Sequence, residues 1–324
     1  MTLFTATELA DAVPLVAALV PPTPQYAWPL LQQRTGVKVI VKHENHTPTG
    51  AFKVRGGMTY MAALAAAGAL PAGLVTATRG NHGQTISLVA ARYGLPACVV
   101  VPEGNSVEKN RAMKALGCEL IVSGRDFDAA RSTAAALREE REWHMVPAFH
   151  KELVRGVGTY AFELFSAHPD LDVVYVPIGM GSGICGLITV RDLLGLDTEI
   201  VGVVADQAPA YALSFDAGHP VSTETAATFA DGMACREPQR EPLDLIRGGA
   251  ARILRLSEDE IADAMRIYYA DTHNIAEGAG AAPLAGLLRE APRYAGRKVG
   301  VILCGGNVDR DKFVQVLQGH TPLP

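Results

Sequence analysis

Short runs of apolar residues alternate along the chain with longer stretches in which apolar positions recur three or four residues apart. The short runs predict buried strands and the longer stretches predict amphipathic helices. We expect strands at residues 37–41, 74–77, 98–101, 119–122, 145–146, 173–176, 200–204 and 299–303. We expect helices at residues 7–20, 30–34, 58–68, 83–93, 108–116, 126–142, 159–166, 184–194, 258–272 and 280–289. This alternation predicts an α/β protein whose parallel sheets are covered by helices on both faces.

The alternation is interrupted in two places. Residues 147–158 are expected to form a break between two α/β units. Residues 206–250, which are punctuated by Pro and Gly, are expected to form loops around a site. The sequence shows no internal repeat, low-complexity tract or flexible linker, so we expect two units that pack closely.

Composition narrows the class of protein. The 324 residues are 48% hydrophobic and 19% charged, which predicts a globular chain with a substantial core. The net charge of -5 argues against nucleic acid or an anionic membrane surface as the main partner. The five cysteines are dispersed without a CxxC pair, and the N-terminus lacks the pattern of a signal peptide. We therefore expect a cytoplasmic protein with reduced cysteines and no membrane span.

One lysine, Lys53, stands among small residues between the expected strand 37–41 and the expected helix 58–68. Burial of a lysine lowers the pKa of its amine and makes the amine nucleophilic toward carbonyl groups. We therefore hypothesise that Lys53 carries a carbonyl cofactor as a Schiff base. His43 and His46 precede it, but no further ligand stands at a recognisable spacing, and we expect no metal site.

Two Gly-containing segments follow expected strands, at the edge where open α/β sheets bind ligands. Residues 78–84 (TRGNHGQ) offer backbone N–H groups at a helix start and the amide of Asn81. They form either an anion site or a capped turn. Residues 179–183 (GMGSG) suit a phosphate cradle. They lack both the Lys-Ser/Thr ending of a nucleoside triphosphate loop and the GxGxxG spacing of a dinucleotide loop.

Two further segments carry chemical groups. Cys304 follows the expected strand 299–303, where it is either a small buried hydrophobic residue or a member of the site. Glu277 precedes the expected helix 280–289, so it either caps that helix or faces a cleft. A lysine, an anion loop and a phosphate loop together favour pyridoxal 5'-phosphate, which needs a Schiff-base lysine, a phosphate cup and a partner for its ring nitrogen.

These motifs resemble those of the threonine/serine dehydratase family of pyridoxal-phosphate-dependent enzymes. Residues 42–56 (KHENHTPTGAFKVRG) resemble the family signature K-x-E-…-T-G-S-F-K-x-R-G, with Ala51 for the usual serine. Residues 79–82 resemble its S-G-N-H loop, residues 179–182 its tetraglycine loop and residues 304–307 its S-G-G-N. The resemblance covers nearly the whole chain, and the motifs are highly specific in combination.

The resemblance implies the tryptophan-synthase-β-like fold, which is fold type II of pyridoxal phosphate enzymes. This fold has two doubly wound parallel-sheet domains with the cofactor in the cleft between them, and its members are commonly homodimers. Residues 1–57 and 150–324 would form the large cofactor-binding domain. Residues 58–149 would form the small domain, which carries the carboxylate-binding loop.

The resemblance also assigns roles to residues. Lys53 is the Schiff-base lysine and the base that removes the α-proton, and Cys304 faces the ring nitrogen. A neutral thiol cannot keep that nitrogen protonated, which favours expulsion of a β-hydroxyl. The implied cofactor-binding residues are Phe52, Lys53, Asn81, Gly179, Met180, Gly181, Ser182, Gly183, Glu277 and Cys304. The implied residues for the substrate carboxylate are Thr78, Arg79, Gly80, Asn81 and His82.

Three departures from the family pattern change the expectations. Arg79 stands where relatives that racemise serine have a serine acting as a base. Arginine stays protonated, so we expect little racemase activity and a contact of Arg79 with an anionic group on the substrate or cofactor. Val204, Ala208 and Ala210 stand where some relatives bind a divalent cation through acidic residues, so we expect that site to be absent. No segment after residue 324 corresponds to the regulatory extension of biosynthetic threonine deaminases, which favours a catabolic role.

The sequence therefore predicts a pyridoxal-phosphate-dependent dehydratase, or ammonia-lyase, that converts a 3-hydroxy amino acid to a 2-oxo acid and ammonia. Threonine, serine and bulkier analogues such as phenylserine are the candidate substrates. A β-replacement enzyme of the cysteine synthase type is the alternative within the same cofactor class. A nicotinamide oxidoreductase of the Rossmann type is less favoured, because the GxGxxG motif is missing.

Overall fold

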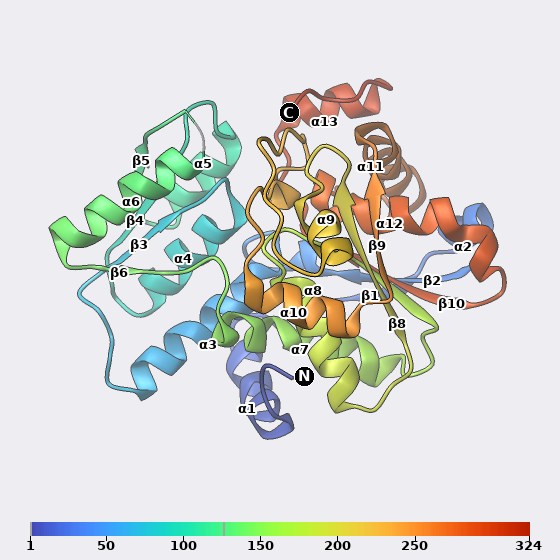
Figure 1. Cartoon of the computed structure of the whole chain (residues 1–324), viewed down its shortest axis with the longest axis horizontal. Helices are drawn as coiled ribbons and strands as arrows, with labels where there is room; N and C mark the ends of the chain where they lie inside the picture. Colours follow the sequence, from blue (N-terminus) through green and yellow to red (C-terminus); the bar gives the residue numbers. More distant parts are fainter. Residues whose placement is uncertain (1, 126) are drawn as a thin grey trace.

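The computed structural model describes residues 2–125 and 127–324 and contains two β-sheets in two lobes (Figure 1). The larger sheet has the strand order β1-β2-β10-β7-β8-β9, and the smaller has β5-β4-β3-β6. The larger sheet consists of β1 (Gln25–Ala27), β2 (Lys38–His43), β7 (Val173–Pro177), β8 (Glu199–Ala205), β9 (Arg252–Leu256) and β10 (Lys298–Leu303). The smaller consists of β3 (Leu74–Ala77), β4 (Ala97–Val101), β5 (Glu119–Val122) and β6 (His144–Met145). Neighbouring strands pair in parallel, except β1 with β2.

Helices cover both sheets, and among the described residues none is long and apolar enough to cross a membrane. The first α-helices are α1 (Ala6–Ala17), α2 (Pro29–Thr35), α3 (Lys53–Ala66), α4 (Asn81–Arg92), α5 (Val107–Ala115), α6 (Phe127–Arg141) and α7 (Lys151–Ala167). The others are α8 (Ser182–Leu193), α9 (Ala210–Ala217), α10 (Arg240–Gly249), α11 (Glu258–Thr272), α12 (Gly278–Glu290) and α13 (Arg310–Leu317). Short 3-10 helices are η1 (Glu44–His46), η2 (Asp231–Met233) and η3 (Ala291–Tyr294).

The burial of the strands on both faces explains why their sequences are continuous apolar runs. Every residue of β4 and β7 is buried, as the continuous Val-rich runs predicted, because helices cover both faces of a parallel sheet. The predicted α/β fold with two parallel sheets is therefore confirmed. All strands of the smaller sheet fall within residues 74–145, and we propose the domain boundary at 58–149 on that ground.

Two helices begin earlier than expected, because glycines inside them hid their first turns. α3 begins at Lys53 and α7 begins at Lys151. Glycine in a helix interior costs about 1 kcal/mol relative to alanine, so a sequence pattern rich in Gly does not predict a helix. A β-carbon on Gly156 would lie 2.2 Å from the carbonyl oxygen of Arg55, and one on Gly56 would lie 2.5 Å from a backbone oxygen of α7. The glycines allow α3 and α7 to pack backbone against backbone.

The expectation of loops over residues 206–250 is wrong in part. The segment contains α9, η2 and α10. Pro242 lies in the first turn of α10, where proline is tolerated, and two glycines end that helix, so the punctuation marks helix ends rather than a continuous loop. The short strands β1 and β9 and the helix α13 were also not expected, and β1 is an antiparallel exception to the predicted parallel sheet.

A cluster of charged side chains is buried beside the start of α3. Arg55 donates from Nε and Nη2 to the carboxylate of Glu44 at 2.7 and 2.9 Å, and from Nη1 to Glu163 at 2.7 Å. Lys42 donates to the same Glu163, and the Thr23 hydroxyl donates to Glu44 at 2.6 Å. The side chains of Lys42, Glu44 and Arg55 are fully buried. The cluster ties β2, η1, α3 and α7 together and so fixes the start of α3.

His43 is a buried hydrogen-bond acceptor. The indole of Trp28 donates to His43 Nε2 at 3.0 Å, and His46 packs against the same imidazole with ring centroids 5.2 Å apart. Burial, aided by the neighbouring His46, lowers the pKa of His43 to about 4, and only the neutral ring can accept the bond from Trp28. Over the part of the chain that the structure describes, no group of three or more His, Cys, Asp or Glu could hold a metal ion.

We expect His43 to make folding stability fall as the pH drops below about 6.5. The unfolded imidazole binds a proton near pH 6.5 and the folded one only near pH 4, so the unfolded state binds more protons within this window. The contribution of His43 to the free energy of unfolding therefore decreases toward low pH, by roughly 2 kcal/mol between pH 7 and pH 5. Urea unfolding at both pH values should show a smaller pH dependence in His43→Leu than in the wild type. The exposed His219→Leu variant should keep the wild-type dependence, and an unchanged dependence in His43→Leu would contradict the assignment.

Candidate active site

Lys53 is the first residue of α3 and faces the cleft between the two sheets. Its Nζ lies 4.9 Å from the centroid of the Phe52 ring. Burial lowers the pKa of Lys53, while Cys304 and Glu277 nearby oppose that shift. Within the described chain no hydrogen bond or ion pair engages this amine. An unpaired amine with a lowered pKa is suited to attack a carbonyl group.

The loop before α4 forms the first candidate anion site. Thr78 Oγ1 accepts from the backbone N–H of Gly80 at 2.9 Å and of Gly83 at 3.4 Å, which fixes the turn. Asn81 and His82 occupy the first turn of α4, where backbone N–H groups lack partners inside the helix and the helix dipole favours an anion. Burial and the nearby Lys53 lower the pKa of His82 to about 4, so this imidazole is neutral. The loop can hold a carboxylate.

The loop before α8 forms the second candidate anion site. Gly181 caps the helix with φ 95°, a conformation that favours glycine, and Ser182 and Gly183 supply unpaired N–H groups in the first turn. Tyr160 donates to the carbonyl oxygen of Gly183 at 3.1 Å, and its ring packs edge-on against Phe52 with centroids 6.1 Å apart. These contacts hold the loop close to Phe52, which directly precedes Lys53.

A chain of polar contacts crosses the cleft. Lys109 of α5 donates to both oxygens of Asp231, at 2.9 and 2.7 Å, and lies 3.4 Å from Glu277. Asn81 donates to Glu277 at 2.6 Å and accepts from Asn307 at 2.9 Å. Burial disfavours the charge of Lys109, but the carboxylates of Asp231 and Glu277 outweigh it and raise its pKa. Burial also raises the pKa of Glu277, with Lys109 opposing. Glu277 and Asn307 together orient the amide of Asn81.

Cys304 follows β10 and lies behind Lys53. Its carbonyl oxygen accepts from the backbone N–H of Phe52 at 3.0 Å, so the two segments are joined directly. Burial, and secondly Glu277, raise the pKa of the Cys304 thiol, while Lys53 opposes. The group beside the lysine is therefore a neutral thiol.

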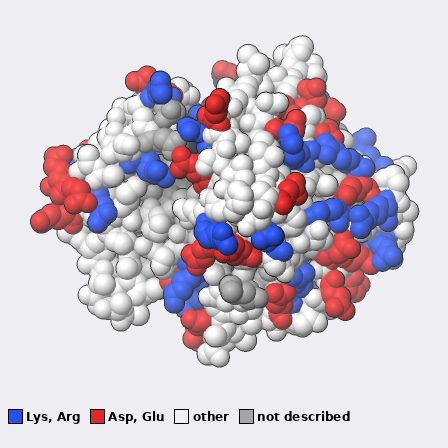
Figure 2. Space-filling model, viewed as in Figure 1, with Lys and Arg blue, Asp and Glu red and all other residues white. Residues whose placement is uncertain are grey.

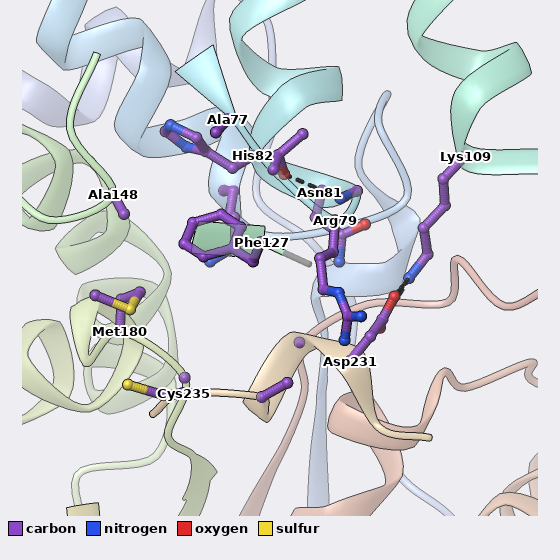
Figure 3. A pocket seen from close by; sticks show the side chains of 16 residues that line it. Ala77, Arg79, Asn81, His82, Lys109, Phe127, Ala148, Met180, Asp231 and Cys235 are labelled. Carbon is purple, nitrogen blue, oxygen red and sulfur yellow. Dashed lines mark hydrogen bonds and ion pairs between the residues drawn. The ribbon is translucent and has the colours of Figure 1, made fainter. Parts of the chain in front are cut away.

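Figure 3 shows the cavity into which these side chains converge, and Figure 2 shows the molecule hollowed between the two lobes with acidic and basic groups at the rim. The cavity brings together eight of the expected site residues, which are Lys53, Thr78, Arg79, Gly80, Asn81, His82, Gly179 and Met180. Five others stand close behind its wall through the contacts described above, namely Phe52, Gly181, Ser182, Gly183 and Cys304. Glu277 lies in an adjoining cavity that also reaches Arg79 and Lys109.

Several residues of the cavity wall were given no role from the sequence. They are Ala77, Lys109, Phe127, Ala148, Asp231, Gly232, Ala234 and Cys235. Asp231 and Gly232 stand in the segment 206–250, which was expected to surround a site, and that expectation was a usable signal. Lys109 carries no such signal, because a lysine on a polar helix is normally solvent-exposed.

The residues around the cavity fit pyridoxal phosphate. The amine of Lys53 has no partner, and the first turn of α8 offers N–H groups to a phosphate. The buried His82 Nε2 also lacks a hydrogen-bond partner among the described residues, which indicates room for a polar ligand beside it. Phe52 supplies an apolar ring next to Lys53, and Asn81 supplies a side-chain amide.

A parallel α/β fold with an unpaired lysine beside two helix N-termini defines an enzyme that binds a carbonyl- and phosphate-bearing cofactor through a lysine. The chain belongs to the family of pyridoxal-phosphate dependent enzymes, whose family model matches residues 16–305. The predicted family and cofactor are thereby confirmed.

Individual relatives agree with this assignment. The chain is 34% identical over 278 residues to an L-threonine ammonia-lyase of Geobacter sulfurreducens, a match that covers 86% of this chain and 69% of that protein. It is 30% identical over 298 residues to an L-threo-3-hydroxyaspartate ammonia-lyase of a Pseudomonas species, covering 92% and 93%. The structure of threonine deaminase isoform 2 from Solanum lycopersicum superposes with a TM-score of 0.88 at 27% identity, covering 98% and 94%. The protein is thus an ammonia-lyase-like member of the family, of fold type II.

We expect Gly179→Ala to weaken cofactor binding. The added methyl group would lie 2.3 Å from the carbonyl oxygen of Gly232, so the 179–183 loop would have to shift. Displaced N–H groups lose hydrogen bonds to the phosphate, and the Kd for pyridoxal phosphate should rise by roughly 10-fold or more. Absorbance titration of the apoprotein measures this. Gly248→Ala is the matched control, because its methyl group enters open space, and equal affinities of the two variants would contradict the phosphate assignment.

Proposed function

We propose that the protein is a pyridoxal-phosphate-dependent dehydratase that removes water from a 3-hydroxy amino acid and releases a 2-oxo acid and ammonia. The observation that carries the proposal is the unpaired amine of Lys53 between the N-termini of α4 and α8. The two ammonia-lyases among its relatives support this reaction class. Threonine, serine and bulkier analogues such as phenylserine are the candidate substrates.

In this proposal Lys53 transfers the proton, and the first turns of two helices position the substrate and the cofactor. When bound, the pyridine ring of the cofactor withdraws electrons from the α-carbon of the substrate. Lys53 Nζ removes the α-proton, because its lowered pKa increases the fraction of free amine near neutral pH. The first turn of α4 binds the substrate carboxylate, and the first turn of α8 binds the cofactor phosphate.

Three further side chains would hold the cofactor ring. Phe52 would pack against one face, and Asn81, which Glu277 and Asn307 orient, would donate to the phenolic oxygen. Cys304 would face the ring nitrogen as a neutral thiol. Such a partner cannot keep that nitrogen protonated, which favours expulsion of the β-hydroxyl group over transamination.

A substrate panel tests the proposal. The holoenzyme is incubated with serine, threonine and phenylserine in every configuration at both carbons, and 2-oxo acid and ammonia are measured. Release of both products in equal amounts from at least one substrate is the expected result. Cysteine formation when sulfide is present, with little 2-oxo acid, would instead identify a β-replacement enzyme.

A homodimer, predicted from the family resemblance, and a cytoplasmic location, predicted from the cysteines and the N-terminus, stay predictions, as does a catabolic role. The same holds for low racemase activity, for which the physical ground is that Arg79 stays protonated and cannot act as a base.

A further inference from the structure

Arg79 places an unpaired positive charge in the wall of the active-site cavity. Its side chain is partly buried and runs from the loop before α4 across the cavity toward η2, on the side away from His82 (Figure 3). No hydrogen bond or ion pair holds its guanidinium in the described structure. A partly desolvated arginine is costly to leave without an anionic partner, and its planar fork suits a carboxylate.

Among the described residues, the acidic groups around the cavity either have other partners or form no ion pair with Arg79. Asp231 gives both carboxylate oxygens to Lys109. Glu277 accepts from Asn81 and stands beside Lys109. Glu224 and Glu237 line an outer cavity that Arg79 also reaches, and neither forms an ion pair with it. Arg79 therefore remains available to a ligand.

Much of the remaining cavity wall is small or apolar. It includes Ala77, Phe127, Ala148, Met180 and Ala234. None of these side chains supplies a charge or a strong hydrogen-bond donor. Apart from Lys53, to which the proposed function assigns the cofactor, Arg79 is the one charged group of this wall, among the described residues, without a protein partner.

We propose that the substrate is a 3-hydroxy amino acid with a second carboxylate, of the 3-hydroxyaspartate class, and that Arg79 binds that second carboxylate. This inference rests on the proposed function and names its substrate class. The α-carboxylate has its own site in the N–H groups of Asn81 and His82, so the side chain of Arg79 serves a different anion. The same loop thus supplies a backbone site for one carboxylate and a side-chain site for the other.

The test compares substrates and variants of the holoenzyme. Wild type, Arg79→Ser and Arg79→Lys are assayed with threonine and with all four stereoisomers of 3-hydroxyaspartate. We expect Arg79→Ser to lower kcat/KM for the preferred 3-hydroxyaspartate isomer by roughly 30-fold or more, and to lower it for threonine by a factor at least about 10-fold smaller. Arg79→Lys should restore part of the loss. Arg111→Ser, an exposed arginine of α5, is the control and should behave as wild type.

A binding measurement keeps the inference separate from the reaction. Malate and lactate, which lack an amino group and do not react, are titrated against wild type and Arg79→Ser by calorimetry. Wild type should bind malate more tightly than lactate, and Arg79→Ser should bind both alike. If no amino acid releases a 2-oxo acid while this malate preference holds, the proposed function fails and the second-carboxylate site stands.

Three outcomes would overturn the inference. Equal losses for threonine and 3-hydroxyaspartate in Arg79→Ser would assign Arg79 to the α-carboxylate or the cofactor. Threonine turnover with no measurable turnover of 3-hydroxyaspartate would leave the proposed function intact and would show that the substrate carries no second carboxylate. Preferred turnover of O-phosphoserine would show that Arg79 binds an anion on the leaving group, not a carboxylate on the β-carbon.

Discussion

Lys53→Ala is expected to lose both the visible absorbance of the bound cofactor and the release of 2-oxo acid. The methyl side chain can neither form a Schiff base nor remove the α-proton. Loss of a proton-transfer group alone lowers kcat by roughly 10²–10⁴-fold, and loss of the covalent anchor adds to that. Absorbance spectra of the purified protein and a 2-oxo acid assay measure the two effects.

A matched control separates chemistry from folding. Lys114→Ala removes an exposed lysine of α5 and should leave spectrum and activity unchanged. Lys53→Ala should unfold at or above the wild-type apoprotein temperature, because it removes a buried amine without a partner. Activity that survives in a folded Lys53→Ala protein would rule out Lys53 as the base.

The second large effect concerns stability. Arg55→Ala is expected to lower the free energy of unfolding by about 3–5 kcal/mol, because it removes the ion-pair partner of the fully buried Glu44 and one of the two partners of the partly buried Glu163. Urea unfolding of the apoprotein at neutral pH measures the loss. Cofactor affinity should fall too, since the buried cluster fixes the start of α3.

Arg240→Ala provides the comparison for this variant. Arg240 donates from Nε to Asp244 at 2.8 Å, and the side chains of Arg240 and Asp244 are 63% and 41% exposed. Solvent screening limits such a pair to about 1 kcal/mol or less. Similar losses in the two variants would show that the buried cluster is no stronger than a surface pair.

The position of Lys53 in the cleft could be predicted from the sequence because its determinants are local. A lone lysine among small residues, and Gly-containing loops that follow strands, each specify a feature within a few positions. The two sheets and most strand positions could also be predicted from the sequence, because a buried parallel strand is a continuous apolar run.

The polar chain through Lys109, Asp231, Glu277 and Asn81 could not be predicted in this way. Its members come from both lobes, and only the relative placement of the two sheets brings Lys109 of α5 onto Asp231 of η2. The early start of α7 escaped prediction for a related reason. In the sequence Gly156 indicates a break in the helix, and only the structure shows that it allows the backbone of α3 to pack against α7.

The glycine contact between α3 and α7 has a consequence for redesign of the enzyme. Because backbone meets backbone at Gly56 and Gly156, the register of the helix that begins with Lys53 tolerates no added side chain there. Libraries that aim at new substrates should therefore keep the glycines of this helix contact and diversify small residues of the cavity wall, such as Ala148 and Ala234, which belong to neither α3 nor α7.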